Sequence, residues 1–160
     1  MASYSTGTGQ AGVMILNVGY SQSTSNNRTT FQVGFQLRSE WSSTYAYGKA
    51  WSGSVAGSSV SGSYDIAGQQ TVSLYQNNNV NRDHNSAGEL SNQTFGFTID
   101  NTNTSGLGGP TTLSRSISVP DIPRASTPSF DSPWPTLENP PQASNTLRVY
   151  TNSLSSGFRF

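Results

Sequence analysis

The clearest pattern along the chain is a strict alternation of apolar and polar residues over residues 31–38. One side of the stretch FQVGFQLR is apolar, and it consists of Phe31, Val33, Phe35 and Leu37. A period of two residues is typical of a β-strand with one buried face and one solvated face. We therefore predict a half-buried antiparallel strand here.

Shorter β-like runs lie on both sides of this strand, namely GVMILNVGY, TVSLYQ, QTFGFTID and TLSRSISVP. Between them, Tyr45, Tyr47 and Trp51 share one alternation phase, so we expect all three to pack in the core. Arg115 occupies an apolar phase, which predicts a strand end, a sheet edge or an ion pair. No long window shows the helical period of about 3.6 residues. The pattern predicts an all-β protein, an antiparallel β-sandwich that is Ig-like or jelly-roll-like.

The composition changes at Val119, because seven of the eight prolines lie between Pro120 and Pro141. Proline-rich sequence favours an extended backbone with few internal hydrogen bonds. We expect a flexible N-terminus over residues 1–10, a sandwich domain over 11–119, and a C-terminal Pro-rich extended arm with short terminal strands over 120–160. Large apolar residues in the arm suggest an assembly arm that grips its own domain or a neighbouring copy: Ile122, Phe130, Trp134, Leu137, Phe158 and Phe160.

Charge and cysteine content exclude several classes of partner. Charged residues make up 10% of the chain, the net charge is zero, and Lys49 is the only lysine. Without a basic patch we expect no nucleic-acid partner, and low net charge removes a barrier to self-association. The chain has no cysteine, so it has no disulfides or thiolate metal sites. The longest apolar run, VMIL, is too short to span a bilayer, and MASYSTGTGQ does not resemble a signal peptide. We expect no membrane partner and synthesis in a cytoplasm.

The stretch VNRDHNSAGELS contains the only histidine, His84. A Ca²⁺ loop fails at Ala87 and Thr94, which lack the required carboxylates, and a zinc site lacks further His or Cys ligands. No G-x-S-x-G motif marks a nucleophile. Asp, Asn and Gly are turn formers, so we interpret the segment as a structural turn built from Asp83, His84, Asn85 and Gly88. We expect no catalytic residues, no metal and no cofactor.

Exposed aromatic residues could still bind sugars by stacking, and the candidates are Tyr45, Tyr47, Trp51 and Trp134. For the first three, core packing is the interpretation that we favour. Trp134, between Pro133 and Pro135, is the best surface candidate for stacking on a glycan. The alternative is that Trp134 anchors the arm to a protein surface.

The segments RDHNSAGEL, TFGFTI, NTSGLGGP and TLSRSISVPDIPRAS together resemble bacteriophage minor tail and receptor-binding structural proteins. The matching positions are His84, Asn85 and Gly88 in a His-Asn-x-x-Gly turn, and residues 122–126 in an Ile-Pro-Arg-Ala-Ser closing segment. Ala87 stands where that family often has an acidic residue, which argues against a cation.

The resemblance implies a non-enzymatic virion structural protein of a tailed phage: a minor tail, tail-tip, fibre or decoration subunit. It would be made in the bacterial host cytoplasm and located in the tail or on the particle surface. Its partners would be copies of itself, other virion proteins and a host-surface glycan. The alternative function is a carbohydrate-binding β-sandwich module for host attachment.

Overall fold

The computed structural model describes residues 1–124, 129–130 and 149–150, and their regular secondary structure consists of β-strands. Two compact units are present, Met1–Ile122 and Pro123–Phe160. In the second unit, the short strands β9 (Ser129–Phe130) and β10 (Val149–Tyr150) pair antiparallel. The described residues include no helix long and apolar enough to cross a membrane. The prediction of an all-β protein is confirmed.

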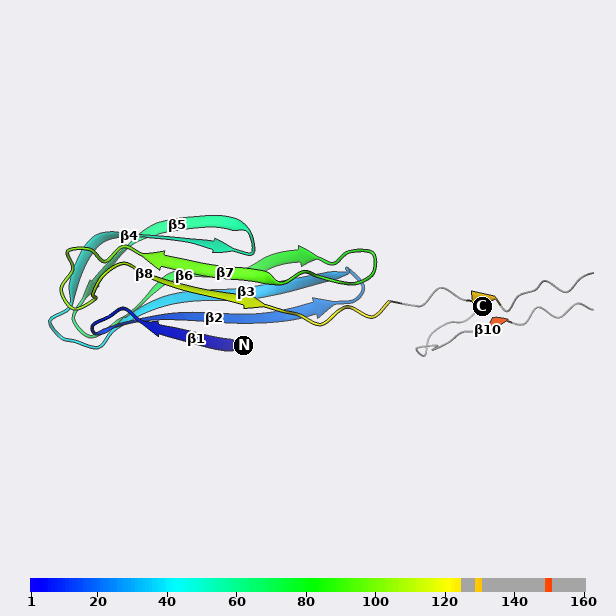
Figure 1. Ribbon diagram of the computed structural model, residues 1–160, viewed down its shortest axis with the longest axis horizontal. Coiled ribbons are helices and arrows are strands. Elements are labelled where there is room, and N and C mark those ends of the chain that lie inside the picture. The colour runs from blue at the N-terminus through cyan, green and yellow to red at the C-terminus, as the bar shows by residue number, and fades with distance from the viewer. Residues whose placement is uncertain (125–128, 131–148, 151–160) are drawn as a thin grey trace, which may run out of the picture. The chain divides into compact units, whose positions relative to one another are not determined.

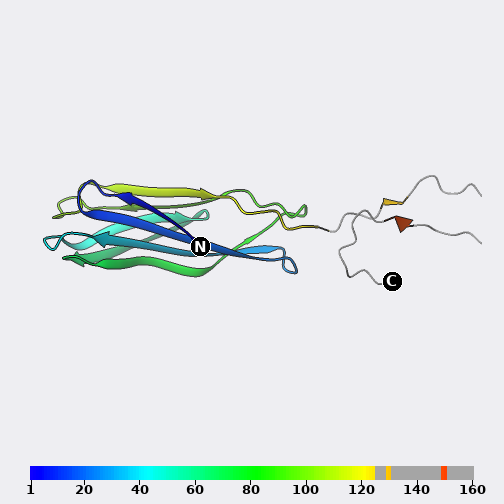
Figure 2. The same cartoon turned by 90° about the horizontal axis from the view of Figure 1, so that it is seen from below.

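The first unit is a sandwich of two four-stranded antiparallel sheets (Figures 1 and 2). Sheet A has the order β1 (Ala2–Gly7), β2 (Gly12–Ser23), β3 (Arg28–Ser39) and β6 (Thr71–Asp83). Sheet B has the order β5 (Ser58–Ala67), β4 (Tyr45–Val55), β7 (Gln93–Ile99) and β8 (Thr111–Ile117).

The order of the strands distinguishes between the two predicted sandwich types. The hairpins β2–β3, β4–β5 and β7–β8 each stay within one sheet, while β3 pairs with β6 and β4 pairs with β7. Counted from β2, this puts the first, second and fifth strands in one sheet and the third, sixth and seventh in the other. That distribution is typical of Ig-like sandwiches. Here the fourth strand, β5, joins the second of these sheets.

The core lies between the inner faces of the two sheets and contains the apolar side of the predicted strand, Phe31, Val33, Phe35 and Leu37. Phe35 from sheet A and Phe97 from sheet B stack with ring centroids 4.3 Å apart and an interplanar angle of 13°. The ring of Trp51 lies 6.4 Å from Phe35 and 6.1 Å from Phe97. All three side chains are buried, so this aromatic group joins the sheets at the centre of the core.

The expected flexible N-terminus is wrong, because residues 2–7 form β1. Ala2–Gly7 pair antiparallel with Val13–Val18 of β2. The segment is polar, so its own composition does not predict a strand. It forms one because its backbone N–H and C=O groups pair with those of β2. Arg115 lies on the edge strand β8, as its apolar phase predicted, and its guanidinium sits 5.6 Å from the ring centroid of Tyr4.

The expected boundary of the sandwich at residue 119 is also too early. Ile122 is 2% exposed, and its N–H donates to the Gly88 carbonyl oxygen at 2.9 Å. An apolar side chain that is buried in this way belongs to the domain rather than to an arm. The first unit accordingly ends at Ile122.

We predict that Phe97→Ala lowers the free energy of unfolding by about 3–5 kcal/mol, since it leaves a cavity in the core. Tyr47→Ala is the matched control, because Tyr47 is also aromatic but exposed; it should change stability by less than about 0.5 kcal/mol. Denaturant unfolding of both variants tests this. Equal losses would contradict the central role of Phe97.

A second prediction concerns Tyr64, whose hydroxyl donates to the Asp100 carbonyl oxygen at 3.1 Å. Burial, with a smaller effect of the Asp100 charge, raises the pKa of Tyr64 to about 12, from 10.0. A phenol whose pKa is raised on folding stabilises the fold fully below pH 10.0, and that stability is lost as pH rises toward 12. Phenolate absorbance should show one late-titrating tyrosine that Tyr64→Phe removes. If the late step survived in that variant, the assignment would be wrong.

Candidate functional site

The predicted turn is held together by His84, which follows the last residue of β6. The side chain is 6% exposed. Its Nδ1 lies 2.7 Å from the Gly88 carbonyl oxygen, and its Nε2 lies 2.7 Å from Thr29 Oγ1 on β3. A carbonyl oxygen only accepts, so Nδ1 carries a proton and donates, and in the neutral ring Nε2 accepts from Thr29. Both ring nitrogens are therefore occupied within the fold.

The neighbouring residues complete a closed turn. Asn85 Oδ1 accepts the N–H groups of Ala87 and Glu89, and Gly88 has φ 86°, a conformation that favours glycine. Asp83 instead pairs with Arg28 across the β3–β6 ladder, with Arg28 Nε 2.6 Å from Asp83 Oδ1. This hydrogen bond from the guanidinium holds the pKa of Asp83 below its usual value.

This arrangement does not bring Asp83 to the histidine as a catalytic partner. Asp83 bonds to Arg28, while the histidine bonds to Thr29 and Gly88. Within the described part of the chain, no group of three or more His, Asp or Glu residues could hold a metal ion. The geometry gives His84 a structural task, the attachment of the β6–β7 loop to β3.

The predicted arm residues fall in three places. Ile122 is buried in the sandwich unit and is not available to grip a neighbour, so its assignment to the assembly arm is wrong. Phe130 belongs to β9, whose backbone alone is described. Trp134, Leu137, Phe158 and Phe160 lie outside the described residues, and with them the predicted stacking role of Trp134.

The prediction that Tyr45 and Tyr47 pack in the core with Trp51 is wrong for both tyrosines. They are 59% and 53% exposed, and their ring centroids lie 4.5 Å apart. The register of β4 against β5 shifts between Ala46 and Lys49, where Gly48 has φ 57°. One extra residue at a bulge reverses the side to which the following side chains point. Trp51 therefore points inward while the two tyrosines, the tyrosine pair, point outward.

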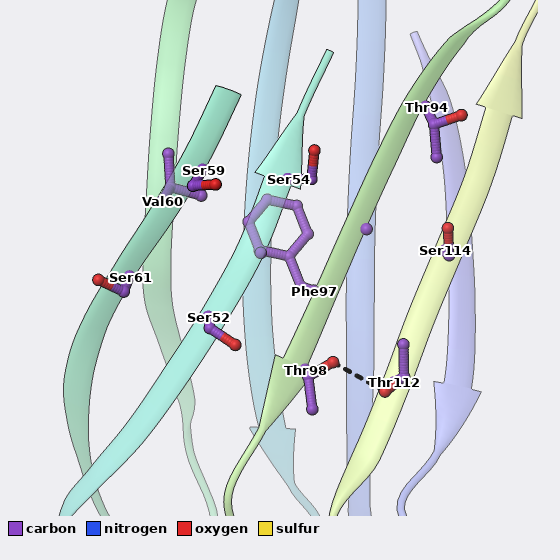
Figure 3. Close-up of a pocket in the computed structure, with 12 residues that line it drawn as sticks. Ser52, Ser54, Ser59, Val60, Ser61, Thr94, Phe97, Thr98, Thr112 and Ser114 are labelled. Atoms are coloured by element: carbon purple, nitrogen blue, oxygen red, sulfur yellow. Dashed lines mark hydrogen bonds between the residues drawn. The ribbon is translucent and has the colours of Figure 1, made fainter. Parts of the chain in front are cut away.

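The exposed Asp65 of β5 lies next to this pair, where its carboxylate accepts the N–H of Gly48. Farther along the outer face of sheet B, the part drawn in Figure 3 carries small hydroxyl side chains. One row across the four strands is formed by Ser61, Ser52, Thr98 and Thr112, which are directly opposite one another. The next row is formed by Ser59, Ser54, Gly96 and Ser114. We call these two rows, with Thr94, the hydroxyl face.

Two shallow hollows of about 570 Å³ and about 460 Å³ lie over the hydroxyl face and share Ser52, Ser61 and Thr98. No charged residue lines the larger hollow among the residues that the structure describes. The smaller hollow continues past Ala50 to Asp100 and Pro110. Sequence reasoning missed this face, although the alternating serines of residues 52–61 and the Gly48 that follows Tyr47 were the signals that could have revealed it.

No family model matches the chain, no curated protein matches its sequence, and no solved structure matches its fold. Function therefore has to be inferred from the residues and their geometry.

The role of His84 can be tested from its partner. Thr29→Val keeps the shape of a fully buried side chain but removes the hydroxyl that faces Nε2. A buried ring nitrogen left unpaired should cost about 1–3 kcal/mol of stability. Thr30→Val is the matched control on the same strand, because the Thr30 hydroxyl bonds at the surface to Asn81; it should cost less than about 0.5 kcal/mol. If urea unfolding gave both variants the same stability, the structural role of His84 would be refuted.

Proposed function

We propose that the chain is a non-enzymatic structural subunit of a tailed-bacteriophage virion, in the minor tail, the tail tip or fibre, or an outer decoration. It would be made in the bacterial host cytoplasm and would act by assembling with copies of itself and with other virion proteins. The sandwich would supply a rigid body, and the segment after residue 124 would supply the attachment between subunits.

One contact supports the proposal best. The two sequence pieces that resemble phage structural proteins, the turn at His84–Gly88 and the segment that starts at Ile122, meet in space. The Gly88 carbonyl oxygen accepts from both His84 Nδ1 and the Ile122 N–H, at 2.7 Å and 2.9 Å. The two matching sequence pieces are thus parts of one structural feature, the contact between the β6–β7 turn and the last residues of the sandwich unit.

The surface of the sandwich is compatible with assembly. Over the whole chain, eight acidic and eight basic residues balance, so no net charge keeps copies apart. Among the strands that the structure describes, β1 and β6 are the edges of sheet A, and β5 and β8 are the edges of sheet B. Unpaired strand edges and extended segments are means by which chains add to one another.

We predict that the full chain and a chain truncated after Arg124 differ in their oligomeric mass in solution. Light scattering coupled to size exclusion should give the full chain the mass of a trimer, a hexamer or a larger ring. A chain that stops after Arg124 should be a monomer with the same thermal midpoint, because the sandwich unit ends at Ile122. A truncated chain that assembles like the full chain would overturn the proposal.

A chain that stops after Val119 is the control for the domain boundary. It loses the buried side chain of Ile122 and the hydrogen bond to Gly88. Its thermal midpoint should fall below that of the longer truncation, since removing a buried aliphatic side chain costs about 2–5 kcal/mol.

A further inference from the structure

We propose that the outer face of sheet B is a binding site for a neutral polysaccharide, with the tyrosine pair as its stacking platform and the hydroxyl face as its hydrogen-bonding floor. The site does not depend on the assembly proposal, because its residues all lie within the sandwich unit.

The first argument is the exposure of the tyrosine pair. Tyr45 and Tyr47 project from the same side of β4, because Ala46 between them is buried and points inward. Two large rings in contact and more than half exposed at a strand surface leave apolar area in water. The negative face of an aromatic ring attracts the weakly positive C–H groups of a sugar ring.

The second argument is the continuity of the surface. Beyond the bulge at Gly48, the outward positions of β4 are Ala50, Ser52 and Ser54. At about 3.3 Å per residue, the distance from Tyr47 to Ser54 is roughly 23 Å. The two hollows cover the part of this stretch from Ala50 to Ser54, and the tyrosine pair lies beyond their end on the same strand. The dimensions suit an extended chain of several sugars rather than a single small molecule.

The third argument is the chemistry of the floor. Thr98 Oγ1 and Thr112 Oγ1 bond to each other at 2.8 Å, and Figure 3 shows this pair beside the other hydroxyls of the face. The hydroxyls of Ser52, Ser54, Ser59, Ser61, Thr94 and Ser114 have no side-chain hydrogen bond within the described part of the chain. Each hydroxyl can donate once and accept twice, as can the hydroxyls of a sugar.

These features favour a neutral sugar chain over other ligands. An apolar protein surface would leave the floor hydroxyls unpaired at a cost in affinity, and protein interfaces usually have their apolar anchors at the centre rather than at one end. A nucleic acid would need Lys or Arg to neutralise its phosphates, and none lines either hollow.

The test is affinity electrophoresis of the full chain in native gels that contain dextran, hydroxyethyl cellulose or galactomannan, three neutral polysaccharides of different linkage. We expect at least one of them to retard the chain, and the anionic polysaccharide alginate to have no such effect. The Tyr45→Ala/Tyr47→Ala variant should bind at least about tenfold more weakly. The hydroxyl variant Ser52→Ala/Ser61→Ala/Thr98→Val should lose affinity to a similar degree.

Tyr20→Ala is the matched control, because Tyr20 is an exposed tyrosine of β2 in the other sheet; it should bind like the unaltered chain. Thermal midpoints establish that each variant is folded. The proposal is overturned if none of the three neutral polymers retards the chain, or if both multiple variants bind as well as the unaltered chain.

The proposal is also overturned if light scattering shows that the hydroxyl variant abolishes an oligomer of the unaltered chain, because the face would then be a protein interface. Failure of the assembly proposal is a separate result, since it depends on the segment after residue 124 and not on the outer face of sheet B.

Discussion

The stack of Phe35 on Phe97 is the contact on which the sandwich depends, because it joins the central strands of the two sheets. In antibody domains, a buried Trp on the third strand packs against a disulfide that links the second and sixth strands. Counted from β2, this chain has Trp51 on the third strand, Phe35 on the second and Phe97 on the sixth. It has no cysteine. A stacked aromatic pair thus occupies the place of the covalent link, and it needs no oxidising compartment to form.

The aromatic rings also explain two glycines in sheet B. A Cβ at Gly53 would lie 2.5 Å from the Gly96 carbonyl oxygen and 2.7 Å from a ring carbon of Phe97. A Cβ at Gly62 would lie 2.8 Å from the indole nitrogen of Trp51. In each case the glycine is directly opposite the aromatic residue on the neighbouring strand. The ring therefore covers the glycine on the inner side, which compensates for the missing side chain. The large side chains of this part of sheet B therefore lie on its inner face, while the outward positions beyond the tyrosine pair carry mostly small side chains.

Strands with a regular alternation of apolar and polar residues could be predicted from the sequence. Features that depend on pairing between segments far apart in the chain could not. Alternation identified β3 and its buried residues correctly, because a half-buried strand must repeat every two residues. The N-terminal strand β1 could not be predicted, since its polar residues are ordered by the free edge of β2. The interpretation of His84 as part of a turn agrees with its geometry. Its partner Thr29 is 55 residues away and could not be identified without the fold. For Tyr45 and Tyr47, strict alternation failed because it takes no account of a bulge.

The bulge at Gly48 determines which aromatic side chains of β4 point into the core and which point to solvent. If β4 alternated regularly through Gly48, with no bulge, Tyr45, Tyr47 and Trp51 would all point to one side, and the strand would supply either three core aromatics or three surface aromatics. With it, one strand places Trp51 against Phe97 and presents two tyrosines to solvent. The side chains that stabilise the sandwich and those exposed on its surface are therefore on opposite sides of the same strand. Substitutions at Tyr45 and Tyr47 can alter that surface while the aromatic group at the centre of the core stays packed.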